Sequence, residues 1–174
     1  MAARLSEARE LHTRALRIRE SVLGPHHPAT AASLNNLGNL AAREADLESA
    51  ERLFRRALSA REAALGPDHS DTSATVHNLA RLVERQGAFE EAEALYARAL
   101  AARDAALGAH PFTASTLSSL GRLLQRRGRE GEAMPLLRRA LAIREACLRP
   151  GHPDTLGSMR DLGKLLQAMG QGEE

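Results

Sequence analysis

A unit of about 42 residues recurs along the chain, and this repetition limits the fold more than any other feature of the sequence. A leucine that begins a Leu-Gly-Pro-type segment returns at intervals of 42, 42 and 41 residues, at Leu23, Leu65, Leu107 and Leu148. An arginine followed by an acidic residue keeps the same period, at Arg19, Arg61, Arg103 and Arg144. Two independent landmarks with one period indicate a repeat array.

Between the landmarks, apolar residues follow helical spacing. Leu34, Leu37 and Ala41 lie at positions i, i+3 and i+7, and a second run of the same kind begins at Ala50. Breaks between the two runs are expected near Ala45–Asp46, at Gly87 and at Gly128. Each unit is therefore predicted to hold a helix A, a tight turn, a helix B and a longer loop. A Thr or Asp in that loop is expected to cap the next helix A.

The register predicts an all-α chain of eight antiparallel-paired helices, arranged as a single array without strands. The array is expected to begin with a half unit over residues 3–23 and to end with a half unit over residues 154–169. Three full units lie between them, over residues 28–66, 70–108 and 112–149. A helix A at the end of the array has no helix B to cover it, so an apolar patch is expected there, formed by Leu156, Met159, Leu162 and Leu166. Either the array is a fragment of a longer one, or its terminal helices pair between molecules.

Composition narrows the possible functions. The chain has 174 residues, of which 43% are hydrophobic and 26% charged, so it can bury a core. A single cysteine, Cys147, excludes an internal disulfide and a site built on several thiolates. A net charge of +2 is too small to argue for a nucleic-acid or membrane surface, and aromatic residues make up only 2%. We expect a cytoplasmic protein with no metal, no cofactor and no membrane contact.

Small residues recur at fixed positions of the repeat, and their pattern is similar to that of a known family. One position of helix A holds Gly38, Ala80, Gly121 and Gly163, and positions of helix B around Phe54, Tyr96 and Leu137 hold alanines. Residues 33–38 read SLNNLG and residues 140–145 read ALAIRE. This pattern resembles the tetratricopeptide repeat, in the 42-residue type of the kinesin light chains. The resemblance implies a right-handed α-α superhelix whose A helices line a concave face. It also implies a protein-binding role without catalysis, and recognition of acidic peptides that contain an aromatic residue.

Polar and basic residues occupy the helix A positions that face away from helix B. These candidate peptide-binding residues are Asn35, Asn36, Asn39, Arg43, His77, Asn78, Arg81, Arg85, Ser119, Arg122, Arg126, Arg160 and Lys164. Asparagine can bond a peptide backbone of any sequence, and arginine favours carboxylates and phosphates. The pattern predicts a groove for an extended acidic segment. The alternative is a solvated helix face whose charges are balanced by Glu44, Glu84 and Glu90.

Other candidate chemistry is weaker. The loop histidines His27, His69, His110 and His152 occur once per unit, too far apart to share one metal ion, so a hydrogen-bonding or capping role is expected. The Arg-acid pairs are expected to be structural, and Cys147 to be half-buried. The leading function is a non-catalytic scaffold that binds an acidic segment. The alternatives are a self-associating structural or regulatory module, and nucleic-acid binding through the Arg rows, against which the shortage of aromatics counts.

Overall fold

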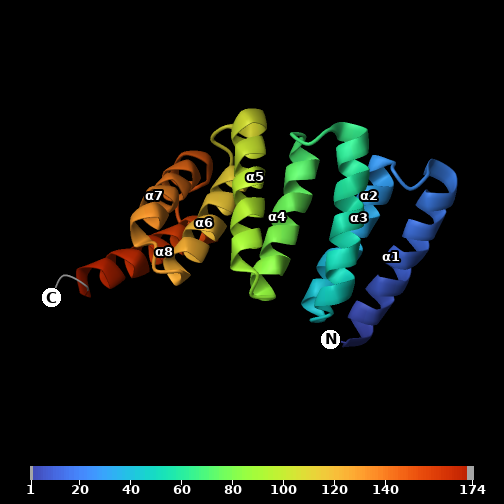
Figure 1. The fold of residues 1–174 in the computed structure, drawn as a ribbon, viewed down its shortest axis with the longest axis horizontal. Helices are drawn as coiled ribbons and strands as arrows, with labels where there is room; N and C mark the ends of the chain where they lie inside the picture. Colours follow the sequence, from blue (N-terminus) through green and yellow to red (C-terminus); the bar gives the residue numbers. More distant parts are fainter. Residues whose placement is uncertain (1, 172–174) are drawn as a thin grey trace. The chain divides into compact units, whose positions relative to one another are not determined.

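The computed structural model describes residues 2–171, which form eight helices and no strand (Figure 1). This confirms the all-α prediction. The helices are α1 (Ala2–Leu23), α2 (Pro28–Arg43), α3 (Leu47–Leu65), α4 (Ser70–Arg85), α5 (Phe89–Leu107), α6 (Pro111–Arg126), α7 (Glu130–Cys147) and α8 (Pro153–Gln171). The even-numbered helices are the predicted A helices, and the odd-numbered helices are the predicted B helices.

The chain forms two compact units, which divide within α5 between Leu95 and Tyr96. In the first unit α1 packs on α2, α2 on α3 and α3 on α4, and α2 also contacts α4. In the second unit α6 packs on α7 and α7 on α8, and α6 also contacts α8. The A helices within each unit are therefore neighbours, and their side chains can form a shared surface.

The turns between helix A and helix B require a left-handed backbone. Two of them use glycine, Gly87 with φ of 86° and Gly128 with φ of 70°, where the missing Cβ removes the steric penalty. The first turn uses Ala45 with φ of 62°, which is the sole non-glycine residue with positive φ in residues 2–171. The predicted turn positions are confirmed, and the first turn is strained.

The loop histidines begin the A helices. The Nδ1 atoms of His27, His69 and His152 each accept a hydrogen bond of 3.1 Å from a backbone N–H two residues later, and His110 does the same at 3.2 Å. The capping role expected of the histidines is confirmed, whereas the prediction that Thr or Asp caps these helices is wrong. Thr30 and Thr72 lie inside the first turn and donate to the carbonyls of Gly24 and Gly66 at 2.9 Å, which closes the loop.

Small residues of helix A lie directly against large residues of helix B. A Cβ atom added at Gly38 would lie 2.8 Å from the Phe54 ring, and one at Gly121 would lie 2.7 Å from Cδ2 of Leu137. Phe54 and Leu137 are fully buried. The glycines therefore allow the closest approach of each helix pair.

An arginine of each full helix B is buried and bonded to the next helix A. Arg61 donates to the Asp71 carbonyl and to Oγ1 of Thr75, both at 2.6 Å, and Arg103 donates to the Phe112 carbonyl at 2.7 Å. Burial lowers the pKa of Arg103 to about 10. These contacts confirm the predicted structural role.

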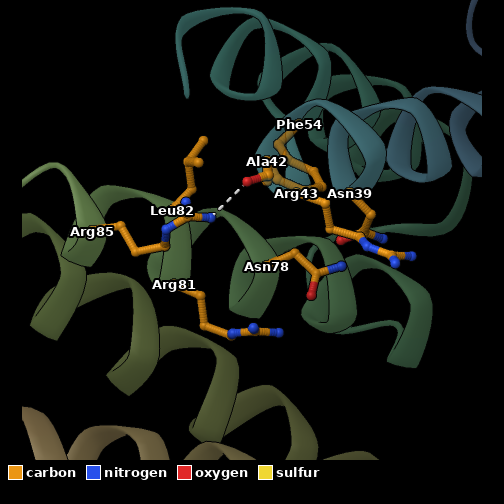
Figure 2. A pocket seen from close by; sticks show the side chains of 8 residues that line it. All are labelled: Asn39, Ala42, Arg43, Phe54, Asn78, Arg81, Leu82 and Arg85. Atoms are coloured by element: carbon orange, nitrogen blue, oxygen red, sulfur yellow. Dashed lines mark hydrogen bonds between the residues drawn. The ribbon is translucent and has the colours of Figure 1, made fainter. Parts of the chain in front are cut away.

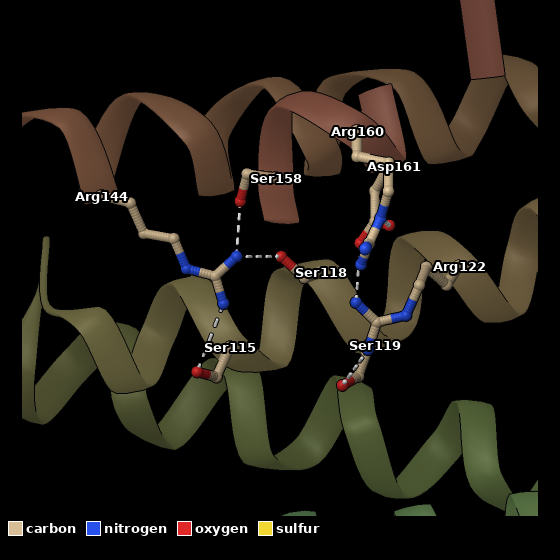
Figure 3. A network of polar contacts seen from close by, with 8 residues as sticks. All are labelled: Ser115, Ser118, Ser119, Arg122, Arg144, Ser158, Arg160 and Asp161. Carbon is tan, nitrogen blue, oxygen red and sulfur yellow. Dashed lines mark hydrogen bonds and ion pairs between the residues drawn. The ribbon is translucent and has the colours of Figure 1, made fainter. Parts of the chain in front are cut away.

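Arg144 repeats this arrangement in the second unit with hydroxyl partners (Figure 3). It donates to Oγ of Ser158 on α8 at 2.5 Å and to Oγ of Ser118 on α6 at 3.0 Å. Near the end of the same helix, Cys147 is exposed, with its Sγ 3.3 Å from the Ala109 carbonyl. The prediction of a half-buried cysteine is wrong, because this last turn of α7 carries Cys147 on its solvent side.

Candidate functional site

Five of the predicted binding residues line one pocket of the first unit (Figure 2). Helix α2 contributes Asn39 and Arg43, and helix α4 contributes Asn78, Arg81 and Arg85. The pocket has a volume of about 260 Å³, and its remaining lining comes from Ala42, Leu82 and Phe54. The period of the repeat places these side chains together, because α2 and α4 present equivalent positions to the same side.

Asparagine side chains link the two A helices at the edge of this pocket. Nδ2 of Asn78 donates to Oδ1 of Asn35 at 3.1 Å. The second N–H of Asn78 and the amide of the exposed Asn39 can still bond a ligand backbone. This bond between asparagines at neighbouring repeat positions thus links α2 to α4, and the other asparagine amides remain available.

The charge of the pocket is positive and only partly compensated. Arg85 donates from Nη1 to the Ala42 carbonyl, 2.8 Å away, in the last turn of α2 (Figure 2). Arg43 and Arg81 are exposed and form no hydrogen bond or ion pair within residues 2–171. Glu44, which follows Arg43 in the sequence, is paired with Arg9. No acidic side chain of the described part of the chain lines the pocket, so it suits a carboxylate or a phosphate.

Three predicted residues of the first unit are not part of the pocket lining: Asn35, which bonds Asn78, and Asn36 and His77. Asn36 is exposed on α2 and is not part of the lining. His77 is 8% exposed and is therefore largely buried within α4. The sequence groups these residues with Asn39 and Asn78 because the repeat period places all of them on the same helices.

In the second unit, an acidic residue pairs with one arginine of the predicted basic row (Figure 3). Nη1 of Arg122 on α6 lies 2.9 Å from Oδ2 of Asp161 on α8, and Nη2 donates to Oγ of Ser119 at 3.3 Å. Asp161 is buried, so this ion pair is partly shielded from solvent. Arg160 lies 4.0 Å from the other carboxylate oxygen of Asp161. The face formed by α6 and α8 is thus not simply basic, although Arg126 and Lys164 are exposed on it.

Asp161 is the residue that sequence reasoning missed. It occupies the repeat position of Asn36, Asn78 and Ser119, so an acid in a row of neutral residues was a visible signal. Its contact with Arg122 joins two repeats, and the spacing within one repeat does not reveal it.

Within residues 2–171, no group of three or more His, Cys, Asp or Glu side chains is placed to hold a metal ion. None of the helices in this range is both long enough and apolar enough to cross a membrane.

Antiparallel helix pairs that recur at a fixed period, with a small residue of one helix against a large residue of the other, define a helical-repeat protein. A family model described as tetratricopeptide repeat matches residues 2–63, 43–105, 71–146 and 112–174. The chain therefore belongs to the tetratricopeptide repeat family. Repeats of this family form scaffolds for protein–protein interaction, generally without catalysis.

Solved structures of similar proteins agree with this assignment. The repeats of a putative kinesin light chain from Podosopora anserina are 29% identical, with a TM-score of 0.80 over 98% of this chain and 81% of that one. A single-residue variant of that protein is 28% identical, with a TM-score of 0.81 and the same coverage. BtubC (BKLC) from P. vanneervenii is 25% identical, with a TM-score of 0.85 over 95% of this chain and 66% of that one. None of the curated proteins matches the chain significantly.

Proposed function

We propose that this protein is a non-catalytic scaffold that holds an extended acidic segment of a partner protein against α2 and α4. The observation that carries the proposal is the pair of exposed, unpaired guanidinium groups of Arg43 and Arg81, at a pocket without an acidic lining residue among residues 2–171. Arginine binds a carboxylate through two parallel hydrogen bonds, which adds direction to the charge attraction. Asn39 and Asn78 would bond the backbone of the segment.

The spacing of α2 and α4 limits the length of the segment that both helices can contact. Neighbouring packed helices are about 10 Å apart, and an extended peptide advances ~3.3 Å per residue. The two A helices of the first unit therefore span about three residues of ligand. A segment with two carboxylates within that length would satisfy both Arg43 and Arg81.

The second unit is expected to contribute less to binding of an acidic segment. Arg122 already has a carboxylate partner in Asp161, and a ligand would have to displace that buried group. Displacement leaves Asp161 without its partner, which offsets the gain from the new contact. Arg122 should therefore matter less than Arg43 or Arg81.

A peptide-library selection on the full chain tests the proposal. We expect enrichment of acidic peptides by the natural protein and loss of that enrichment in the double variant Arg43→Glu/Arg81→Glu. The matched control is Arg138→Glu/Arg149→Glu, which reverses two exposed arginines outside the pocket and so changes the net charge by the same amount. Acidic enrichment that survives in Arg43→Glu/Arg81→Glu, or that disappears equally in the control, would contradict the proposed site.

A second candidate function is self-association through the terminal helices. Leu156, Met159 and Leu166 on α8 are 54%, 45% and 47% exposed, as predicted, whereas Leu162 is half-buried. Leu11 and Ile18 on α1 are also exposed. Burial of these faces between two molecules would remove apolar surface from water. Sedimentation of the full chain should then show concentration-dependent oligomers that dissociate in Met159→Glu, and a monomer at every concentration would exclude this candidate.

A further inference from the structure

A larger hollow lies on a different face of α2, between α1 and α3, which both pack on α2. Its volume is about 390 Å³. The floor consists of Leu16, Leu37 and Leu53, and three arginines stand around it, Arg9, Arg52 and Arg56. It shares no lining residue with the pocket of Arg43 and Arg81.

Three side chains that line the hollow are smaller than those at the same places one repeat later. Thr13, Ala41 and Ser49 correspond, 42 residues on, to Arg55, Val83 and Glu91. In that later repeat Arg55 bridges Glu51 and Glu91 with hydrogen bonds of 2.9 Å to each. Thr13 is too short to form such a bridge, and its hydroxyl donates to the Arg9 carbonyl of its own helix at 2.7 Å.

The floor of the hollow is apolar and well ordered by packing. Leu16 and Leu37 belong to a buried cluster with Leu34 and Ala57, and Leu53 packs against that cluster. A ligand group that enters the hollow therefore meets preformed hydrocarbon walls. Pockets that bind small ligands have volumes of roughly 300–1,000 Å³, so the hollow has room for one large side chain.

The surrounding arginines give the mouth of the hollow a positive lining. Arg56 is paired with Glu20 at 2.7 Å and Arg52 with Glu48 at 3.2 Å, and Arg9 is paired with Glu44. None of these glutamates lines the hollow. Ion pairs at an exposed surface contribute little, so a carboxylate from a ligand can replace a glutamate at low cost.

We propose that this hollow is a second binding site, which receives one large apolar side chain of a partner protein with a carboxylate on either side of it. The apolar floor selects the side chain, and the arginines select its acidic neighbours. Because the two sites use different faces of α2, each can be changed without the other.

Methyl-labelled NMR of the full chain tests this with three short peptides. The probe is N-acetyl-Glu-Leu-Glu-amide, and its matched controls replace leucine by alanine or both glutamates by lysine. We expect the methyl signals of Leu16, Leu37 and Leu53 to shift with the probe, and to shift much less with either control. No shift at millimolar probe, or equal shifts with all three peptides, would overturn the proposal.

The repeat supplies a variant that closes the hollow. Thr13→Arg, Ala41→Val and Ser49→Glu together install the side chains found 42 residues later, and probe binding should weaken by about tenfold or more. The control Thr13→Ala leaves the hollow open and should bind as before. If circular dichroism shows that the closed variant does not fold, Arg52→Glu/Arg56→Glu tests the site instead. This variant reverses the charge at exposed positions only, so it should fold. Binding that persists in the folded closed variant, or in the charge-reversed one, would refute the site.

A last variant separates this site from the pocket on the other face of α2. Arg43→Glu/Arg81→Glu should leave the leucine methyl shifts unchanged while it removes acidic enrichment in the library. Loss of both signals in that variant would mean that one site explains both results, and would overturn the second site.

Discussion

The close approach of α6 and α7 predicts opposite effects for the same substitution at two equivalent glycines. Gly121 faces Leu137, and a new Cβ would lie 2.7 Å from Cδ2 and 2.9 Å from Cγ of that leucine. The Cγ atom is two bonds from the Cα atom, so it can move away less easily than the end of a side chain. Gly163 holds the same repeat position on α8, where a new Cβ meets nothing within 4 Å.

The magnitudes follow from two competing terms. Alanine is favoured over glycine inside a helix by about 1 kcal/mol. Overpacking of a tight core costs about 1–3 kcal/mol. At Gly121 both terms apply and partly cancel, so Gly121→Ala should lower the free energy of unfolding by up to about 2 kcal/mol. At Gly163 only the first applies, so Gly163→Ala should raise it by up to about 1 kcal/mol.

Urea unfolding followed by circular dichroism measures both changes. A third variant, Leu137→Ala, removes the atoms that crowd Gly121, and in that background Gly121→Ala should no longer destabilise. A Gly121→Ala variant that is as stable as Gly163→Ala, or a cost at Gly121 that is unchanged by Leu137→Ala, would refute the close-contact reasoning.

Further predictions concern the turns, the caps and the core. Ala45→Gly should raise the free energy of unfolding by about 0.5–1 kcal/mol, and with it the urea midpoint. The reason is that glycine removes the backbone strain of an alanine with φ of 62°. His110→Ala should cost about 0.5–2 kcal/mol in the same assay, because it removes the cap of α6. Asp46 has a pKa below its ordinary value because the side chain and the backbone of Ser49 form hydrogen bonds with its carboxylate. The contribution of these bonds to stability is therefore present above about pH 4 and is lost as the pH falls through the lowered pKa. Thermal unfolding between neutral and acid pH should therefore depend less on pH in Asp46→Asn. Leu120→Ala should cost about 2–5 kcal/mol by urea unfolding, because Leu120 is buried on α6.

The number of helices and the turns between them could be predicted because they depend on spacing within one repeat. The period located each break, and Gly87 and Gly128 mark two of them directly. The caps could be predicted only in part: the sequence indicates a hydrogen-bonding or capping role for the loop histidines, but it also favours Thr or Asp as caps of the A helices. Histidine is not among the preferred cap residues, whereas threonine is, and the structure assigns Thr30 to loop closure instead.

The sequence predicted where the candidate site lies, but not which of its arginines are free of an acidic partner. The repeat put arginines on the A-helix face of both units. Whether each arginine is available depends on contacts between repeats, and Arg122 meets Asp161 whereas Arg81 meets no acid among residues 2–171. The hollow beside α1 depends in the same way on side-chain sizes from three different helices, which no single repeat displays.

The buried arginines also bear on how such an array can evolve. Arg61 and Arg103 each bond a main-chain carbonyl of the next repeat, and that atom is supplied equally by Asp71 and by Phe112. The junction therefore places little demand on the side chain at this position of the neighbour. At these two junctions, a repeat that is duplicated or exchanged by recombination brings its own arginine and meets a carbonyl that already fits, whereas Arg144 needs the hydroxyls of two serines. Whole-repeat changes in length are thus open to this lineage at low cost, while the exposed faces remain free to diverge.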